Sequence, residues 1–220
     1  MKMKNIAAVA MAGCMAASLA AGGGSPASAA TDASSAASTE AATSEATEAT
    51  GTSANGFTVQ YGPNPETLDP ALNSSIDGAN TIITTFEPLL LIDENNEVVP
   101  GQAEMPEVSE DGLTWTFTMK DGLKWSDGSD LTAKDFEYSF KRLASPDTAA
   151  PYGETVVGMI DGYQDAIGNP DAGGNTTTDP DWDALNVVAS EDGKDLTITL
   201  SYPCSYFDKL AAFVATSPVQ

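Results

Sequence analysis

The chain has 220 residues and carries 32 acidic against 9 basic side chains, which gives a formal net charge of -23. A chain this acidic repels phosphate-rich partners, which argues against nucleic acid and against direct binding to an anionic membrane surface. It also contains no histidine, so it cannot form a Ser-His or Cys-His nucleophile pair or a histidine-ligated zinc site, and we expect no catalytic activity.

Residues 1–22 have the pattern of an export signal, in which two lysines precede a short apolar run of small residues. The run is too short for a transmembrane helix. Three processing sites stay open: a lipobox-like segment ahead of Cys14, another that ends just before Gly22, and an Ala-x-Ala site at 27–29. All three predict export to the cell surface or periplasmic space, and lipidation of Cys14 would anchor the protein to the cytoplasmic membrane.

Residues 23–56 form a low-complexity segment: 28 of its 34 residues are Ala, Ser, Thr or Gly, and none is Val, Ile, Leu, Met or aromatic. Such a segment cannot bury a core. Its position between the signal and the rest of the chain predicts a disordered tether of roughly 30 Å, with an unselected leader as the alternative. The folded part is therefore expected to begin at residue 57.

The predicted elements of the folded part begin with a strand at 57–61, where polar and apolar residues alternate until prolines break the pattern. A helix follows at 79–86, and Pro88 ends it ahead of an apolar run at 89–92. In the segment 114–119, threonines alternate with Trp, Phe and Met between two Asp-Gly turns, which predicts a strand in a meander.

The clearest helical pattern starts at Thr132, a suitable N-cap with Asp135 three residues later. Phe136, Phe140 and Leu143 then fall on one face of this helix. The remaining predicted elements are a helix at 156–167 that two glycines interrupt, a strand at 196–200 and a short helix at 206–213. The mixture of strands and helices predicts the α/β or α+β class.

The motifs of metal, cofactor and nucleophile sites are missing. Asp179, Asp181 and Asp183 have the spacing of the first ligands of a calcium loop, but the Gly and Glu that complete the motif are absent, which favours a solvated loop. We therefore predict no cofactor and no metal. Cys204 is the single cysteine of the folded part, so no disulfide can form within it, and we expect a packed thiol.

Six segments carry a further signal: 67–75, 86–90, 108–117, 124–128, 132–136 and 145–152. They include Leu-Asp-Pro at 68–70, Lys-Trp-Ser-Asp-Gly at 124–128 and Ala-Pro-Tyr at 150–152. In order and spacing these segments resemble the oligopeptide-binding proteins of bacterial ABC importers, the extracellular solute-binding proteins of family 5. The tail of the chain is also similar, so the resemblance covers residues 57–220.

The resemblance implies the first part of a two-lobe, periplasmic-binding-protein type II-like fold with an extra domain. Residues 57–90 would begin lobe I, residues 91–184 would form the extra domain, and residues 185–220 would return to lobe I. The second lobe is expected to be absent, because the resemblance identifies the chain as an N-terminal portion.

The resemblance also implies where a ligand binds. In the family, the segment after Leu-Asp-Pro offers an edge to which a peptide adds as a strand, and this role carries over to Ser74, Ser75 and Ile76. The tyrosine of Ala-Pro-Tyr carries over to Tyr152. Without a ligand role, the serines would form an exposed turn, Ile76 would be a core residue and Tyr152 a surface aromatic.

The implied function is that of a monomeric substrate-binding component, which binds oligopeptides outside the cytoplasmic membrane and delivers them to the permease subunits of an ABC transporter. One alternative is a family member specific for another solute, such as a dipeptide, a nickel complex or a sugar. Another is a secreted acidic surface or adhesion domain, which an acidic coat and a long tether would suit equally well.

Overall fold

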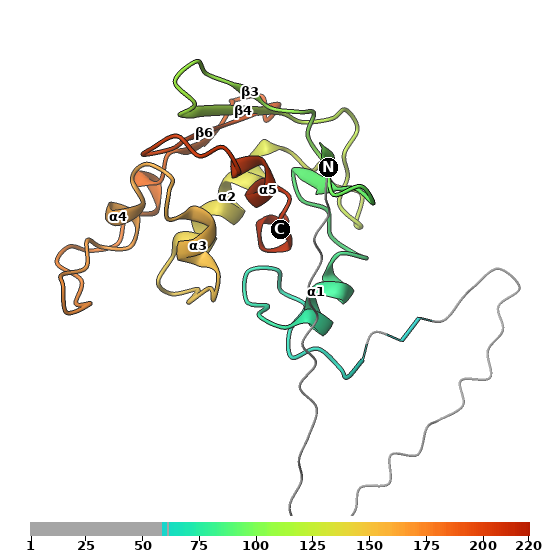
Figure 1. The fold of residues 1–220 in the computed structure, drawn as a ribbon, viewed down its shortest axis with the longest axis horizontal. Coiled ribbons are helices and arrows are strands. Elements are labelled where there is room, and N and C mark those ends of the chain that lie inside the picture. Colours follow the sequence, from blue (N-terminus) through green and yellow to red (C-terminus); the bar gives the residue numbers. More distant parts are fainter. Residues whose placement is uncertain (1–58, 61) are drawn as a thin grey trace, which may run out of the picture. The chain divides into compact units, whose positions relative to one another are not determined.

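Short strands and helices are mixed along residues 59–60 and 62–220, the part of the chain that the computed structural model describes (Figure 1). In chain order the elements are α1 (Ile76–Ile82), β1 (Leu90–Ile92), β2 (Val98–Pro100), β3 (Glu107–Val108), β4 (Thr114–Thr118), α2 (Ala133–Ala144), α3 (Gly153–Val157), α4 (Tyr163–Ala166), the 3₁₀ helix η1 (Trp182–Ala184), β5 (Val187–Ala189), β6 (Asp195–Thr199), α5 (Phe207–Ala211) and the 3₁₀ helix η2 (Val214–Thr216). The predicted signal, the predicted tether and Cys14 lie outside the described residues, as does most of the strand predicted at 57–61.

A four-stranded antiparallel sheet in the order β3–β4–β6–β5 forms one side of the fold (Figure 1). In its middle pair, Trp115 lies opposite Ile198 and Phe117 opposite Leu196. All four side chains are buried, because alternate residues of a strand point to the same face of the sheet. The two strands predicted for this pair are confirmed, but the meander is incomplete, since β4 is joined in the sheet by β6 from much later in the chain.

Helix α2 packs against β5 and β6, below the sheet in the view of Figure 1. Thr132 caps it: the Oγ1 atom accepts a hydrogen bond from Lys134 N at 3.3 Å, and Thr132 N donates to Asp135 Oδ2 at 2.7 Å. Phe136 and Phe140 are fully buried. The predicted capping box and apolar stripe therefore fix both the start of this helix and the face that it buries.

Helix α1 differs from its prediction, because it spans Ile76–Ile82 instead of 79–86. It begins earlier because Ser75 Oγ accepts a hydrogen bond from Gly78 N at 3.0 Å, which makes Ser75 the N-cap. It ends earlier because the chain turns after Ile82, where the Thr85 hydroxyl donates to the Ile82 carbonyl at 3.1 Å.

The helix predicted at 156–167 is divided into the short helices α3 and α4. Gly162 precedes α4 with a φ of 81°, a conformation that favours glycine. A Cβ atom on this residue would lie 1.8 Å from the carbonyl oxygen of Ala184. The bend between the two helices therefore depends on a residue without a side chain.

One core joins segments that were expected to belong to different domains. β5 and β6, from the segment 185–220, share a sheet with β4, and α5 contacts β1. The described residues show no structural boundary at residue 184 and all fall in one compact unit. Cys204 is a buried free thiol. None of the helices in the described part has the length and apolar character needed to cross a membrane.

Candidate functional site

The four residues with an implied ligand role lie around one cavity of about 180 Å³. Ser74, Ser75 and Ile76 line it from the loop before α1 and from the first residue of that helix, and Tyr152 lines it from the residue before α3. Ile76 is 80% exposed, so the alternative of a core residue is wrong for this position. The structure thus brings together residues that are far apart in the sequence.

The loop that carries the serines is held by Asn73, which is buried. The Asn73 amide group donates from Nδ2 to the Ser75 carbonyl at 3.0 Å, and its Oδ1 accepts from Ser75 N at 3.3 Å and from Ser75 Oγ at 3.2 Å. Sequence reasoning missed Asn73. Its signal was an asparagine two residues before a helix cap, a position where such side chains bond to nearby main-chain groups.

The main chain beside Asn73 is open on its outer side. The N–H groups of Ser74 and Ile76 make no hydrogen bond to another described residue, and both side chains are exposed. A segment with available main-chain donors and outward side chains can pair with an added extended chain.

Tyr152 meets a second aromatic ring in the cavity wall. The rings of Tyr152 and Phe213 are T-shaped, with centroids 5.3 Å apart and an interplanar angle of 84°. This edge-to-face contact is a favourable arrangement for aromatic pairs. Since Tyr152 is still 36% exposed, one part of its ring is fixed by Phe213 while another part is accessible.

An ion pair links the loop before α1 to the last turn of α2. Arg142, the single arginine of the chain, donates from Nη1 to Asp69 Oδ1 at 2.9 Å and from Nη2 to Asp69 Oδ2 at 2.5 Å. These bonds are the main reason why the pKa of Asp69 lies below its ordinary value and the pKa of Arg142 above its own. The turn that leads to Ser74 begins at Asp69, so the pair connects the cavity wall to the core helix.

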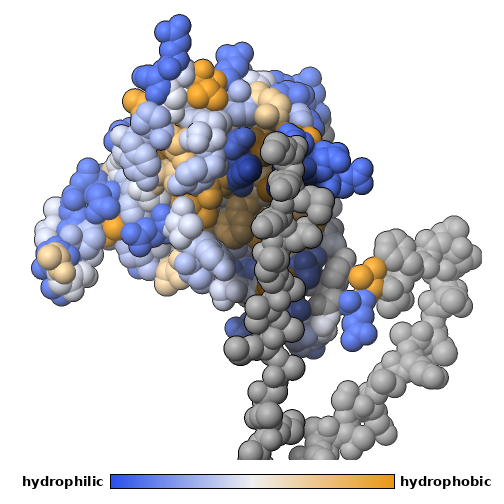
Figure 2. All heavy atoms as spheres, viewed as in Figure 1, coloured by the Kyte–Doolittle hydropathy of each residue, from blue (hydrophilic) through white to orange (hydrophobic). Residues whose placement is uncertain are grey.

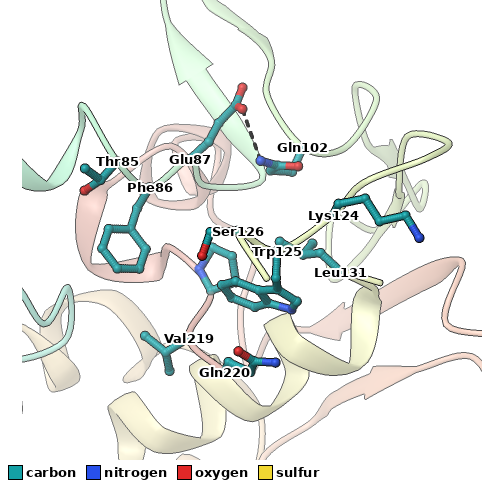
Figure 3. A pocket seen from close by; sticks show the side chains of 11 residues that line it. Thr85, Phe86, Glu87, Gln102, Lys124, Trp125, Ser126, Leu131, Val219 and Gln220 are labelled. Atoms are coloured by element: carbon teal, nitrogen blue, oxygen red, sulfur yellow. Dashed lines mark hydrogen bonds between the residues drawn. The ribbon is translucent and has the colours of Figure 1, made fainter. Parts of the chain in front are cut away.

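A larger hollow of about 610 Å³ was not predicted (Figure 3). Phe86, Trp125 and Val219 give it apolar walls, and Glu87 accepts a hydrogen bond from Gln102 Nε2 at 3.1 Å beside them. Phe86 and Trp125 belong to two of the segments that carry the family resemblance. Their place in these segments was the one indication in the sequence that they could have a role. Their meeting depends on the fold, so no local pattern could indicate it.

The outer surface on the face shown in Figure 2 is mainly hydrophilic, with hydrophobic residues gathered in a hollow near its centre. Two of the acidic side chains, Asp121 and Asp183, are exposed to 95% and 90% even though each pairs with a lysine. Such solvated pairs contribute little to stability. These two carboxylates therefore lie on a solvated surface.

Comparison with known proteins gives one consistent result. Residues 97–220 match the family model described as bacterial extracellular solute-binding proteins, family 5 (middle region). The chain is 38% identical over 159 residues to the periplasmic oligopeptide-binding protein OppA of Salmonella typhimurium, covering 72% of this chain and 27% of that protein. It is 34% identical over 181 residues to OppA of Bacillus subtilis, covering 77% of this chain and 31% of that protein.

Solved structures give the same picture. OppA of Haemophilus influenzae, in complex with the peptide RPPGFSPFR, superposes with a TM-score of 0.63 at 28% identity, covering 73% of this chain and 29% of that one. The murein tripeptide binding protein MppA of Escherichia coli superposes with a TM-score of 0.61 at 36% identity, covering 71% and 29%. The predicted fold class is therefore confirmed, and the chain spans less than a third of the length of these proteins.

Proposed function

Because the chain belongs to the bacterial extracellular solute-binding proteins of family 5, we propose that it is part of a receptor that binds oligopeptides outside the cytoplasmic membrane. The receptor would deliver these peptides to the permease subunits of an ABC transporter. The names of the relatives describe binding proteins for oligopeptides, murein peptides and dipeptides, and we propose a binding role without catalysis for this chain.

The cavity formed by Ser74, Ser75, Ile76 and Tyr152 is the observation that carries the proposal. An extended peptide would pair with the main chain at Ser74 to Ile76, where two N–H groups have no partner among the described residues. Main-chain bonds of this kind give affinity for peptides of many sequences. The exposed part of the Tyr152 ring would pack against the bound peptide.

The proposal also gives a role to each segment of the chain. Residues 1–22 would direct export, Cys14 would carry a lipid anchor, and residues 23–56 would act as a tether for a monomeric receptor. Residues 57–90 would begin lobe I. Residues 91–184 would form the extra domain, to whose sheet β5 and β6 (residues 187–199) add two strands, and the chain would return to lobe I within residues 185–220.

The test is binding by the complete gene product, purified, unfolded to release any cargo that it carries, and refolded. Calorimetry with peptides of two to nine residues should give one-to-one binding. Matched controls are a sugar, a nickel complex and deoxycholate, the last because one relative at 32% identity is named a probable deoxycholate-binding protein. Binding of a control instead of peptide would change the solute class, and binding of none would favour a surface or adhesion domain.

A further inference from the structure

We propose that the last turn of α2 positions both walls of the candidate cavity, and that the Asp69–Arg142 ion pair is the positioning contact for the wall formed by Ser74 to Ile76. This inference rests on the proposed peptide-binding function. Neither Asp69 nor Arg142 lines the cavity, so both act indirectly, by positioning the residues that do.

The first link runs from Arg142 to the start of α1 through a continuous series of hydrogen bonds. Asp69 Oδ1, which accepts from Arg142, also accepts from Ala71 N at 3.0 Å, and the Asp69 carbonyl accepts from Asn73 N at 3.1 Å. Asn73 then holds Ser75 through three bonds, and Ser75 Oγ caps α1. A displacement of the Asp69 carboxylate would therefore be passed on to Ser75.

The second link is steric. Gly153, the residue after Tyr152, begins α3 beside the end of α2, and a Cβ atom on it would lie 2.5 Å from the Leu143 carbonyl oxygen. Arg142 and Leu143 are neighbours in the chain. The two walls of the cavity are thus set by adjacent residues of one helix, which Phe136 and Phe140 fix in the core.

The chemistry of the pair suits a positioning role. A guanidinium that makes two parallel bonds to a carboxylate fixes the orientation as well as the distance of its partner, which a lysine ammonium does not. The side chains of Arg142 and Asp69 are only 20% and 27% exposed, so solvent competes little for these bonds. Elsewhere in the loop, Leu68 and Leu72 are exposed, whereas Pro70 and Ala71 are buried directly after Asp69.

The experiment compares variants of the complete gene product. Asp69→Asn keeps the shape of the side chain and removes its charge, and Arg142→Lys keeps the charge and loses the paired geometry. Asp121→Asn is the matched control, because it removes the charge of an exposed pair with Lys194. Affinity is measured by calorimetry with one peptide that the unmodified protein binds, and local structure by amide hydrogen exchange at Ser75 and Gly78.

We expect Asp69→Asn to bind the peptide about tenfold more weakly and to exchange faster at both amides. Arg142→Lys should be intermediate, and Asp121→Asn should match the unmodified protein in both readouts. Unchanged affinity in Asp69→Asn would overturn the positioning role and leave the proposed function intact. If the unmodified protein binds no peptide, the proposed function fails, and unchanged exchange at Ser75 and Gly78 would then overturn the structural link as well.

Discussion

Asn73 occupies the space that a side chain on residue 78 would need: a Cβ atom built on Gly78 would lie 1.9 Å from Asn73 Oδ1. The close approach lets the Asn73 amide reach Ser75 while the main chain of α1 passes beside it. The first turn of α1 and the loop before it therefore fit together only with glycine at this position.

Gly78→Ala should disturb this contact and with it the edge at Ser74 to Ile76. We expect a loss of about 1 to 3 kcal/mol in the free energy of unfolding, as for an overpacked buried site, and weaker peptide binding. Urea denaturation and calorimetry on the complete gene product measure the two effects. Gly173→Ala is the control, because a Cβ atom there would meet only side chains of an exposed loop. Equal stability of both variants would contradict the prediction.

Tyr152→Ala should lower peptide affinity by on the order of 1 to 2 kcal/mol, about five- to thirtyfold, because the ring supplies contact area in the cavity. Tyr152→Phe should retain most of the affinity if packing is the main contribution. The control is Tyr202→Ala, which removes an exposed tyrosine outside the cavity. Calorimetry that finds the same affinity in all three variants would return Tyr152 to the role of a surface aromatic.

The Asp69–Arg142 pair should give stability a specific dependence on pH. The pKa of Asp69 in the folded protein lies below the ordinary value of 3.8. Its contribution to the free energy of unfolding is therefore complete above that ordinary value and is lost as the pH falls toward the lower folded-state pKa.

The measurement is urea denaturation of the unmodified protein and of Asp69→Asn between pH 7 and about pH 2.5. The difference in stability should be largest near neutral pH and shrink below about pH 4. Carboxylates elsewhere titrate in both proteins and cancel in the difference. A difference that does not change with pH would show that the charge of Asp69 contributes no stability.

Cys14 should be the site of lipid attachment in the producing cell. Labelled palmitate is expected to appear in the mature protein and to be lost in Cys14→Ser, while export continues. Mass spectrometry of the mature N-terminus gives an independent reading. An unlabelled protein that begins at Ala30 would contradict the prediction and show ordinary cleavage at the Ala-x-Ala site instead.

The sequence predicted those elements whose signals are local. Thr132 and Asp135 lie three residues apart, so the capping box of α2 could be anticipated, and alternation within five residues was enough for β4 and β6. The start of α1 was missed although Ser75 is a suitable N-cap, because the helix was placed from the spacing of its apolar residues. A bond between Asp69 and Arg142 joins residues 73 positions apart, and no periodicity spans such a distance.

The candidate site was predicted only through family resemblance. Composition and periodicity gave no reason to group Tyr152 with Ser74. Phe213 was predicted only as the last residue of a helix and not as part of the site. The larger hollow was missed for a related reason. Its walls come from segments near residues 86, 102, 125 and 219, and such a surface exists only after the chain has folded.

The order of the strands in the sheet has a consequence for synthesis. Thr118 of β4 and Asp195 of β6, whose side chains are hydrogen-bonded in the folded protein, are 77 positions apart. At about 5 to 20 residues per second, β6 leaves the ribosome roughly 4 to 15 s after β4. α2 is completed during this interval, but the strand that pairs with β4 at Phe117 is not. Until β6 is made, β4 has an unpaired edge on that side.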